Sequence, residues 1–264
     1  KDAGRVIGCL GMISFIALMV AFYSVSEAAI GIDAVSTNKG TSQTITVSHT
    51  SSGTDRLMLV GISLGYNTLS ISSITYNGDA LSLVGTRQYM SYALMYMYQL
   101  VAPDTGNHDL SVTFSGTPTN GAVVGVATFT GVDQTTPLGT FASAGNRSTT
   151  PSVNVSSASG ELVFDTLAYS WGTITGVGAG QTARWNDSQG IARGAASTEP
   201  GASTTTMSWT VTDDYWAIGA VPIKPAAAVA QYDQDRFRAR NDNGSETTST
   251  WTKAANTNWT QMVD

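Results

Sequence analysis

Residues 56–81 read RLMLVGISLGYNTLSISSITYNGDAL, and this stretch indicates the fold class. Its first part, Arg56–Leu64, is apolar at nearly every position, which is typical of a central strand covered on both faces. Its second part, Ile71–Tyr76, is followed by the pair Asn77-Gly78 and by a further apolar residue, Leu81. Because Asn-Gly tolerates the positive φ angles of a type I′ turn, we expect a β-hairpin here.

Short runs of the same kind recur along the chain, bounded by clusters of Gly, Pro, Asn and Asp. Tyr92–Val101 and His108–Phe114 flank Pro103 and Gly106, which predicts a second hairpin. So many short strands separated by turn signals predict an all-β fold, a two-sheet β-sandwich of jelly-roll type, preceded by one N-terminal hydrophobic helix. The expected strands are Thr44–Ser48, Arg56–Leu64, Ile71–Tyr76, Leu81–Arg87, Tyr92–Val101, His108–Phe114, Ala122–Phe129, Ser152–Ser156, Glu161–Tyr169, Thr182–Trp185, Ala192–Thr198, Thr205–Val211 and Trp216–Ile223.

Charge and composition narrow the classes of partner. The formal net charge is −6 and the sequence pI is near 4.8. A protein of this charge has no basic stripe to neutralise phosphates, so we expect no nucleic-acid partner. Charged residues make up only 12% of the chain, and Gly, Ser and Thr take their place at the surface.

The first 28 residues are expected to act as an export signal. Lys1–Arg5 is a short charged stretch, and Val6–Val25 then runs without a charge up to Ser26-Glu27-Ala28. A positive start, an apolar middle and a small-x-small end indicate a secretion signal, cut near Ala28. The apolar run is also long enough for a retained membrane anchor, and both alternatives stay open. Either way we expect a secreted or cell-surface protein that meets the membrane only through this segment, if it is not cleaved.

The rest of the chain is divided by a change of composition. Residues 29–224 are expected to form the β-sandwich domain, and residues 225–231 have neither charge nor periodicity, as in a linker. Residues 232–264 are more polar and cannot bury a core of their own. We interpret them as the start of a second β module that is cut off here.

Three segments of the first domain resemble a β-sandwich repeat found in secreted and surface proteins of bacteria and archaea. They are Asp55–Ser63, Ile74–Leu81 and Phe129–Gly139, and the resemblance covers roughly residues 40–224. The strand that begins Glu161-Leu162-Val163 and the late pair Trp209 and Trp216 also fit that pattern. The resemblance implies an extracellular location and this architecture, and it brings no catalytic residues.

A second resemblance lies in the C-terminal segment. Phe237–Glu246 (FRARNDNGSE), with Thr250-Trp251, resembles a short extracellular β motif that often follows such domains. Asn243 stands where that motif would have Asp, which is a departure from its pattern. The resemblance again implies location alone.

Catalytic chemistry finds little support in the sequence. The two histidines, His49 and His108, lie on or beside expected strands, where we interpret them as structural surface residues. No HExxH motif occurs, and the Gly-x-Ser-x-Gly match at Gly61–Gly65 lies within the expected strand Arg56–Leu64 and not at the strand-to-helix turn that a nucleophile elbow requires. Glycosidases use a pair of carboxylates, and the candidates here are Glu161, Asp165, Asp187, Glu199, Asp213 and Asp214. Glu161 and Asp165 lie on one expected strand, and their spacing along it is too long for a retaining pair. We therefore expect no enzyme.

Calcium is the one cofactor for which the sequence offers ligands. Turn carboxylates and amides supply the hard oxygen atoms that Ca²⁺ prefers. The candidate ligands are Asp213, Asp214, Asp242 and Asn243, although no EF-hand spacing is present. We expect at most a structural Ca²⁺ and no other cofactor.

Two stretches place a tryptophan beside polar residues at the end of a strand, as a carbohydrate site requires. The candidate ligand-binding residues are Tyr169 and Trp171 in the first stretch, and Trp185, Asn186 and Asp187 in the second. Trp209 alternates with Met207 and Val211, so it is expected in the core.

These patterns favour a non-catalytic extracellular β-sandwich module of a larger surface or secreted protein, used for adhesion, display or matrix structure. Its partner would be a glycan or another cell-surface polymer. The first alternative is a carbohydrate-binding module attached to a polysaccharide-active enzyme. The second alternative is a glycoside hydrolase in its own right.

Overall fold

The computed structural model describes residues 29–66 and 68–227, and beyond them the short strands at 237–240, 246–249, 251–252 and 260–261. The described residues contain strands and turns but no helix, so the all-β prediction is confirmed for this part of the chain. Accordingly, no helix within it could cross a membrane. The predicted N-terminal helix lies outside the described residues.

The strands fall into two halves of the main domain. The first half contains β1 (Gly31–Gly40), β2 (Thr44–Ser51), β3 (Leu57–Gly65), β4 (Ile71–Tyr76), β5 (Asp79–Ala80), β6 (Ser82–Tyr89), β7 (Ala93–Val101), β8 (Gly106–Phe114) and β9 (Ala122–Thr130). The second half contains β10 (Ala142–Ser148), β11 (Ser152–Val155), β12 (Leu162–Ser170), β13 (Ile174–Val177), β14 (Thr182–Gln189), β15 (Ala192–Pro200), β16 (Thr205–Val211) and β17 (Asp214–Ile223).

The second half repeats the strand order of the first. The first half has an inner sheet β1-β9-β3-β7-β6 and an outer sheet β2-β8-β4-β5. The second half has an inner sheet β10-β17-β12-β15-β14 and an outer sheet β11-β16-β13. Replacing β1, β2, β3, β4, β6, β7, β8 and β9 in turn by β10 to β17 converts one arrangement into the other, with only β5 unmatched.

Local irregularities repeat at equivalent positions as well. The register shifts between the first and third residues of both β4 and β13, and between the second and fourth residues of both β6 and β14. The Ser70 amide donates to Ser115 Oγ at 3.1 Å, and in the second half the Thr173 amide donates to Thr212 Oγ1 at 3.0 Å. The correspondence therefore extends from strand order to bulges and single hydrogen bonds.

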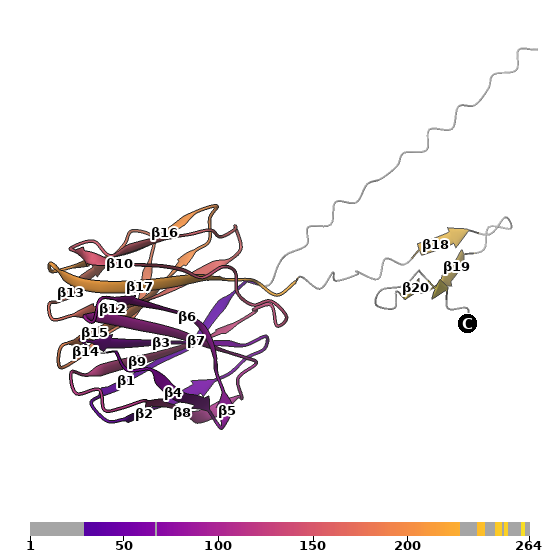
Figure 1. Ribbon diagram of the computed structural model, residues 1–264. Helices are drawn as coiled ribbons and strands as arrows, with labels where there is room; N and C mark the ends of the chain where they lie inside the picture. The colour runs from indigo at the N-terminus through magenta and orange to yellow at the C-terminus, as the bar shows by residue number, and fades with distance from the viewer. Residues whose placement is uncertain are drawn as a thin grey trace, which may run out of the picture.

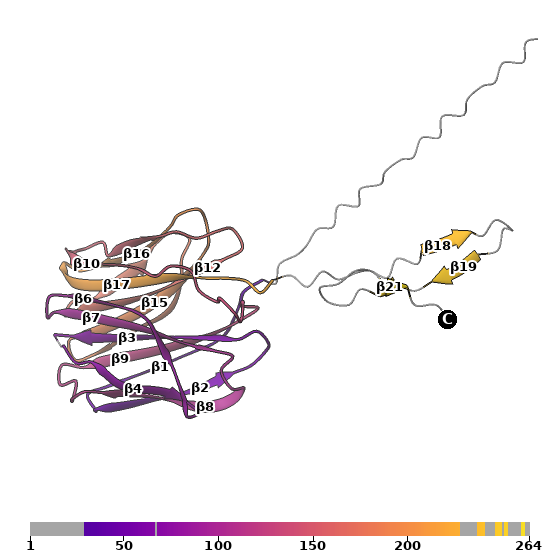
Figure 2. The same cartoon turned by 45° about the vertical axis from the view of Figure 1, so that its right-hand side comes forward.

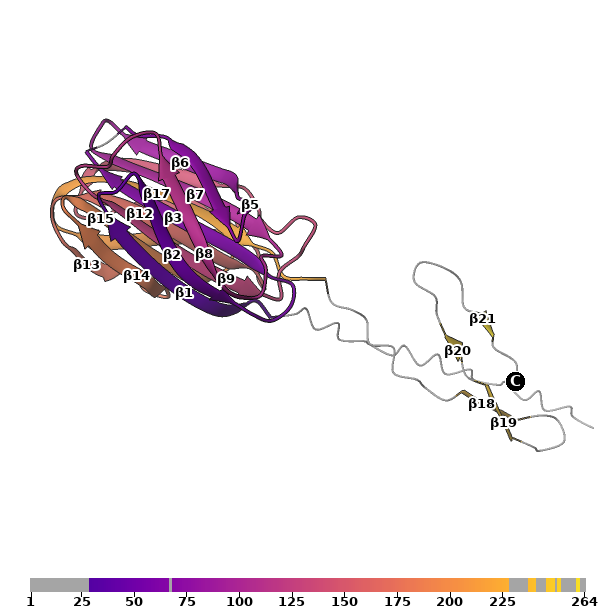
Figure 3. The same cartoon turned by 90° about the horizontal axis from the view of Figure 1, so that it is seen from below.

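The four sheets lie in successive layers with three apolar clusters between them (Figure 1). The first cluster, which includes Ile62 and Phe114, fills the space between the outer and inner sheets of the first half. The second, with Phe129 and Phe164, joins the two inner sheets, and the third, with Trp209, fills the second half. Seen from below, the strands of these layers run in a similar direction (Figure 3). The sequence predicted one core between two sheets, whereas the structure has three clusters.

The two inner sheets approach closely because glycines face the opposite half. A Cβ at Gly61 would lie 2.4 Å from Thr166 Oγ1, and a Cβ at Gly125 would lie 2.2 Å from the Trp185 ring. Ser63 Oγ donates to the Leu167 carbonyl at 3.0 Å across the same boundary. The halves are therefore packed as one body, as tightly as a protein interior.

The described chain enters and leaves the main domain at the same end (Figure 2). Gly31 pairs with Thr130 at the start of β1, and the Ala226 amide donates to the Gly131 carbonyl at 2.8 Å. Val132 forms an isolated bridge with Pro225. Because β3 and β12 run away from this end, their last residues lie at the opposite end.

The Asn77-Gly78 hairpin is confirmed, with φ of 49° at Asn77 and 94° at Gly78 between β4 and β5. The second predicted hairpin is wrong. Strand β7 pairs with β3 and β6 in the inner sheet, whereas β8 pairs with β2 and β4 in the outer sheet. The turn around Pro103 therefore carries the chain from one sheet to the other, so that both strands can contribute to the first apolar cluster.

The short strands β18 (Phe237–Arg240) and β19 (Glu246–Ser249) pair with each other, as do β20 (Trp251–Thr252) and β21 (Thr260–Gln261). The rest of this C-terminal segment lies outside the described residues, as does most of the predicted linker.

Candidate functional site

Five aromatic side chains gather at the end of the main domain that lies opposite the chain ends. We call this cluster the aromatic tip, and it consists of Tyr66, Tyr89, Tyr92, Trp171 and Tyr215. Tyr66 follows the last residue of β3, and Trp171 follows the last residue of β12. Tyr89 and Tyr92 border the β6–β7 turn, and Tyr215 lies near the start of β17. The tip is therefore built from both halves.

Tyr66 and Trp171 occupy equivalent positions in the two halves. Both have positive φ, 47° and 67°. The Tyr66 amide donates to the Tyr92 carbonyl at 2.8 Å, and the Trp171 amide donates to the Ile191 carbonyl at 2.9 Å. Tyr92 directly precedes β7, which pairs with β3, and Ile191 directly precedes β15, which pairs with β12. The repeated architecture thus brings the same kind of turn from both halves to one place.

The rings of the aromatic tip form a continuous series of contacts. Tyr215 stacks on Tyr92 with ring centroids 4.0 Å apart and lies 6.1 Å from Tyr89. Tyr66 meets Tyr92 edge to face at 4.7 Å and Trp171 at 6.2 Å. Offset and edge-to-face contacts of this kind are the favourable arrangements of aromatic rings. Four rings therefore support the position of the fifth, Trp171.

Trp171 is exposed, and so is Met90, which lies between Tyr89 and Tyr92 in the β6–β7 turn. Trp171 is 55% and Met90 62% accessible, and together with Leu83 they are the exposed large hydrophobic side chains of the described residues. Met90, in the β6–β7 turn, also has a positive φ of 50°. The left-handed conformation costs about 1–2 kcal/mol for each residue other than glycine. Trp171 and Met90 thus combine a strained backbone conformation with an exposed apolar side chain. Strained backbone is concentrated at functional sites.

Two cations and two carboxylates surround the rings. The Arg147 guanidinium lies 5.5 Å from the centre of the Tyr215 ring and 3.3 Å from the Asp213 carboxylate. Arg193 donates from Nε to the Gly172 carbonyl at 3.0 Å. Burial, and to a lesser extent the Asp214 charge, raises the pKa of Tyr66 above its ordinary value. The formal charges of these four side chains sum to zero.

The two stretches of predicted ligand-binding residues lie in different environments. Trp171 is at the tip, but Tyr169 is fully buried and donates its hydroxyl to the Thr212 carbonyl at 2.6 Å. Trp185 is 7% exposed, and its ring fills the space between the inner sheets above Gly61 and Gly125. Its ring therefore has no open face for a ligand.

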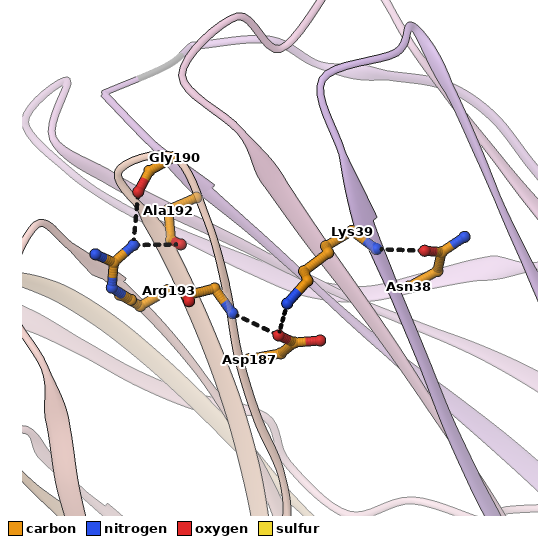
Figure 4. Close-up of polar contacts among 7 residues, drawn as sticks. Asn38, Lys39, Asp187, Gly190, Ala192 and Arg193 are labelled. Carbon is orange, nitrogen blue, oxygen red and sulfur yellow. Dashed lines mark hydrogen bonds and ion pairs between the residues drawn. The ribbon is translucent and has the colours of Figure 1, made fainter.

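Asn186 and Asp187 follow Trp185 on β14 and are held by contacts within the protein. Asn186 Nδ2 donates to the Ile174 carbonyl at 3.2 Å. Asp187 forms an ion pair with Lys39 of β1, across the boundary between the halves (Figure 4). Trp171 therefore belongs to the aromatic tip, whereas Asn186 and Asp187 take no part in the ring contacts there.

The structure describes two of the four predicted calcium ligands. Asp213 pairs with Arg147, and Asp214 accepts from the Tyr215 amide at 2.8 Å. Asp242 and Asn243 lie outside the described residues. Within the part that is described, no group of three or more acidic, histidine or cysteine side chains is arranged to hold a metal ion.

Asp165 is the carboxylate with the most perturbed pKa. Burial raises its pKa to about 7, although hydrogen bonds from Trp209 and Ser197 oppose the rise. Its side chain is 0% exposed in the third apolar cluster, between the sheets of the second half. A perturbed pKa in a cleft would suggest a catalytic group, but this carboxylate is enclosed and cannot contact a ligand from solvent.

One interpretation of the histidines is wrong. His49 is 1% exposed, with Nε2 at 2.6 Å from Thr128 Oγ1 and Nδ1 at 3.0 Å from Ser36 Oγ. It is a buried residue and not a surface one, because hydroxyl groups on β1 and β9 satisfy both of its ring nitrogens. His108 is partly exposed, and its Nε2 lies 3.0 Å from the Thr105 carbonyl oxygen.

Sequence reasoning missed most of the aromatic tip. Tyr66, Tyr92 and Tyr215 are far apart along the chain, and only the strand order brings them together. Their one shared signal is that each stands next to the end of an apolar run. No protein-family model, no curated protein and no solved structure matches this chain. The aromatic tip of this repeated all-β domain is therefore defined by its geometry alone.

Proposed function

We propose that the chain is a non-catalytic, exported module of a larger surface or secreted protein, and that it serves adhesion, display or matrix structure. Each half forms a jelly-roll-like β-sandwich in this proposal, and the two sandwiches pack through their inner sheets. The single observation that carries the proposal is the position of the aromatic tip.

The aromatic tip lies at the far end from the points where the chain enters and leaves. Residues at the entry and exit, Gly31 and Ala226, both contact the segment Thr130–Gly131. A domain attached at one end presents its other end to the surroundings. Exposed aromatic side chains at that end suit a contact surface, since Trp and Tyr carry much of the energy of binding interfaces.

A carbohydrate-binding module attached to a polysaccharide-active enzyme is the second candidate, and the exposure of Trp171 favours it. A solvent-facing indole can stack on the apolar face of a sugar. Arg147, Asp213 and Asp214 supply polar groups nearby.

The test is a binding measurement on the full chain immobilised through its C-terminal end. A panel of cell-wall polymers, extracellular matrix polymers and intact cells would be passed over it, and hydrolytic release from the same polymers would be measured in parallel. We expect binding to at least one polymer or cell type, without release of product. Turnover that a single carboxylate substitution abolishes would contradict the proposal, and so would the absence of binding to every surface.

The matched variants are Trp171→Ala and Leu83→Ala. Both residues are large, apolar and about half exposed, at 55% and 51%. Leu83 lies six residues before Tyr89 on β6, roughly 20 Å from the tip by the rise of a strand. Binding should fall in the first variant and persist in the second. Equal loss in both would show that the tip is not the contact surface.

A further inference from the structure

We propose that the aromatic tip binds an uncharged glycan, with a sugar ring stacked on Trp171. This inference rests on the proposed function, because it names the class of ligand that the contact surface would take. Three features of the tip support this proposal: the fixed position of the exposed indole, the balance of charge around it, and the contribution of both halves.

The indole of Trp171 is held in place before any ligand arrives. Its backbone amide is bound by the Ile191 carbonyl at 2.9 Å, and its ring meets the Tyr66 ring at an interplanar angle of 87°. Tyr66 is in turn supported by Tyr92, which stacks on Tyr215. A ring fixed in this way loses little conformational entropy on binding, which favours a weakly interacting ligand such as a sugar.

The charged side chains at the tip are paired or engaged. Arg147 forms an ion pair with Asp213. Arg193 Nε donates to the Gly172 carbonyl at 3.0 Å. Its Nη1 donates to the Gly190 carbonyl at 2.8 Å (Figure 4). Asp214 accepts a hydrogen bond from the Tyr215 amide.

These four groups, two positive and two negative, balance one another in charge, so together they attract neither an anionic nor a cationic polymer. The next cation, Arg87, is half-buried and lies two residues before Tyr89 on β6, further from the tip. The same four groups retain donor and acceptor capacity for hydroxyls, since guanidinium and carboxylate groups make several hydrogen bonds each. Charge balance therefore favours an uncharged, hydroxyl-rich ligand over a uronate or an amino sugar.

The site needs both halves of the domain. Trp171 comes from the second half, whereas its supporting rings Tyr66 and Tyr92 come from the first. Ser170 Oγ donates to the Tyr92 carbonyl beside them, across the boundary. The stacking platform therefore exists only when the two inner sheets are packed, and a bound sugar would stabilise that packing.

The experiment measures the affinity of the full chain for three linear oligosaccharides of equal length. One is a neutral glucose oligomer, the second carries carboxylates as uronic acids, and the third carries protonated amines as glucosamine. Calorimetry and quenching of tryptophan fluorescence report binding. We expect the neutral oligomer to bind most tightly, with little dependence on salt.

Trp171→Ala should weaken binding of the neutral oligomer by about tenfold, which corresponds to about 1.4 kcal/mol, because the stacking contact with the indole is lost. Trp171→Phe should retain part of the affinity, and Leu83→Ala should match the unmodified chain. Circular dichroism and unfolding curves of each variant show whether it is folded.

The outcomes separate the two proposals. Tighter, Trp171-dependent binding of a charged oligomer would overturn the uncharged ligand class and leave the contact surface standing. Binding of the neutral oligomer that survives Trp171→Ala would overturn the stacking site. Trp171-dependent binding to a protein or to cells, but to no oligosaccharide, would also overturn the glycan, whereas no binding to anything would end both proposals.

Discussion

The Trp209 indole donates a 2.7 Å hydrogen bond to the buried carboxylate of Asp165. The other carboxylate oxygen accepts from the Ser197 amide at 2.6 Å and from Ser197 Oγ at 2.8 Å. Asp165 is the fourth residue of β12, and the fourth residue of β3 in the other half is Val60, which is fully buried among apolar residues. At this position the second half therefore has a hydrogen-bonded polar network, whereas the first half has only apolar packing.

Burial of the Asp165 carboxylate predicts that the stability of the fold decreases as the pH rises. The pKa of Asp165 is about 7 in the folded chain, above the ordinary value of 3.8. The unfolded chain therefore loses its proton first, so the contribution is fully present below about pH 4 and disappears by about pH 7. The difference amounts to about 4 kcal/mol at most. Denaturant unfolding at a series of pH values measures it.

Asp165→Asn should remove this slope between about pH 4 and pH 7, because an amide does not titrate there. Its absolute stability should be lower at acid pH, since the amide N–H₂ would face the donors on Trp209 or Ser197. Asp109→Asn, at an exposed carboxylate, is the control and should keep the slope. An unchanged slope in Asp165→Asn would exclude Asp165 as its source.

His49 predicts a slope of the opposite sign. Burial lowers the pKa of His49 below its ordinary value of 6.5. The unfolded chain then binds the proton more readily, so the stabilising contribution is present above about pH 6.5 and is lost as the pH falls through the lower folded value. His49→Gln should flatten this acid limb. An acid limb as steep as that of the unmodified chain would assign the effect to other groups.

Gly125 should not accept a side chain. Gly125→Ala would place its Cβ 2.2 Å from the rigid Trp185 ring, and overpacking of this kind costs about 1–3 kcal/mol. Gly176→Ala is the matched control, because its Cβ would come no closer than 3.9 Å to Thr210. Thermal or denaturant unfolding compares the two variants. Equal stability would mean that the inner sheets can separate at little cost.

Backbone strain at the tip predicts a difference between two truncations of Trp171. Both Trp171→Ala and Trp171→Gly remove the indole, but only glycine adopts a φ of 67° without cost. The glycine variant should therefore be more stable than the alanine variant by about 1–2 kcal/mol. Both should lose ligand binding equally. A more stable alanine variant would show that the turn relaxes once the ring is gone.

Much of the strand pattern could be predicted because buried strands are apolar in the sequence. The sequence predicts that β3 is a central strand, and it lies between β9 and β7 in its inner sheet. The strands missed by sequence reasoning include β1, β10 and β13, which are the edges of their sheets. The segment Ala142–Ser148 reads ASAGNRS, with small or polar residues at every position, so it has no apolar alternation that would mark a strand.

The repeat itself could not be predicted. Equivalent buried positions differ in chemistry, as Val60 and Asp165 do, and as Gly61 and Thr166 do at the boundary between the halves. Packing requires that the two inner faces complement each other, so a glycine in one half faces a larger side chain in the other. Because of this complementarity, residues at equivalent positions of the two halves differ in type. The strand order and the bulges are the same in both halves, although the sequences do not show it.

The attachment of both flanks at one end has a mechanical consequence. A force pulling Ile30 away from Ala226 would act first on the pair Gly31 and Thr130, at the very start of β1. The strand would then peel from β9 one residue pair at a time, so the load would never be shared along the whole ladder. Tension applied to the two flanks would therefore open this domain by unzipping from its base, while the opposite end bore none of the load.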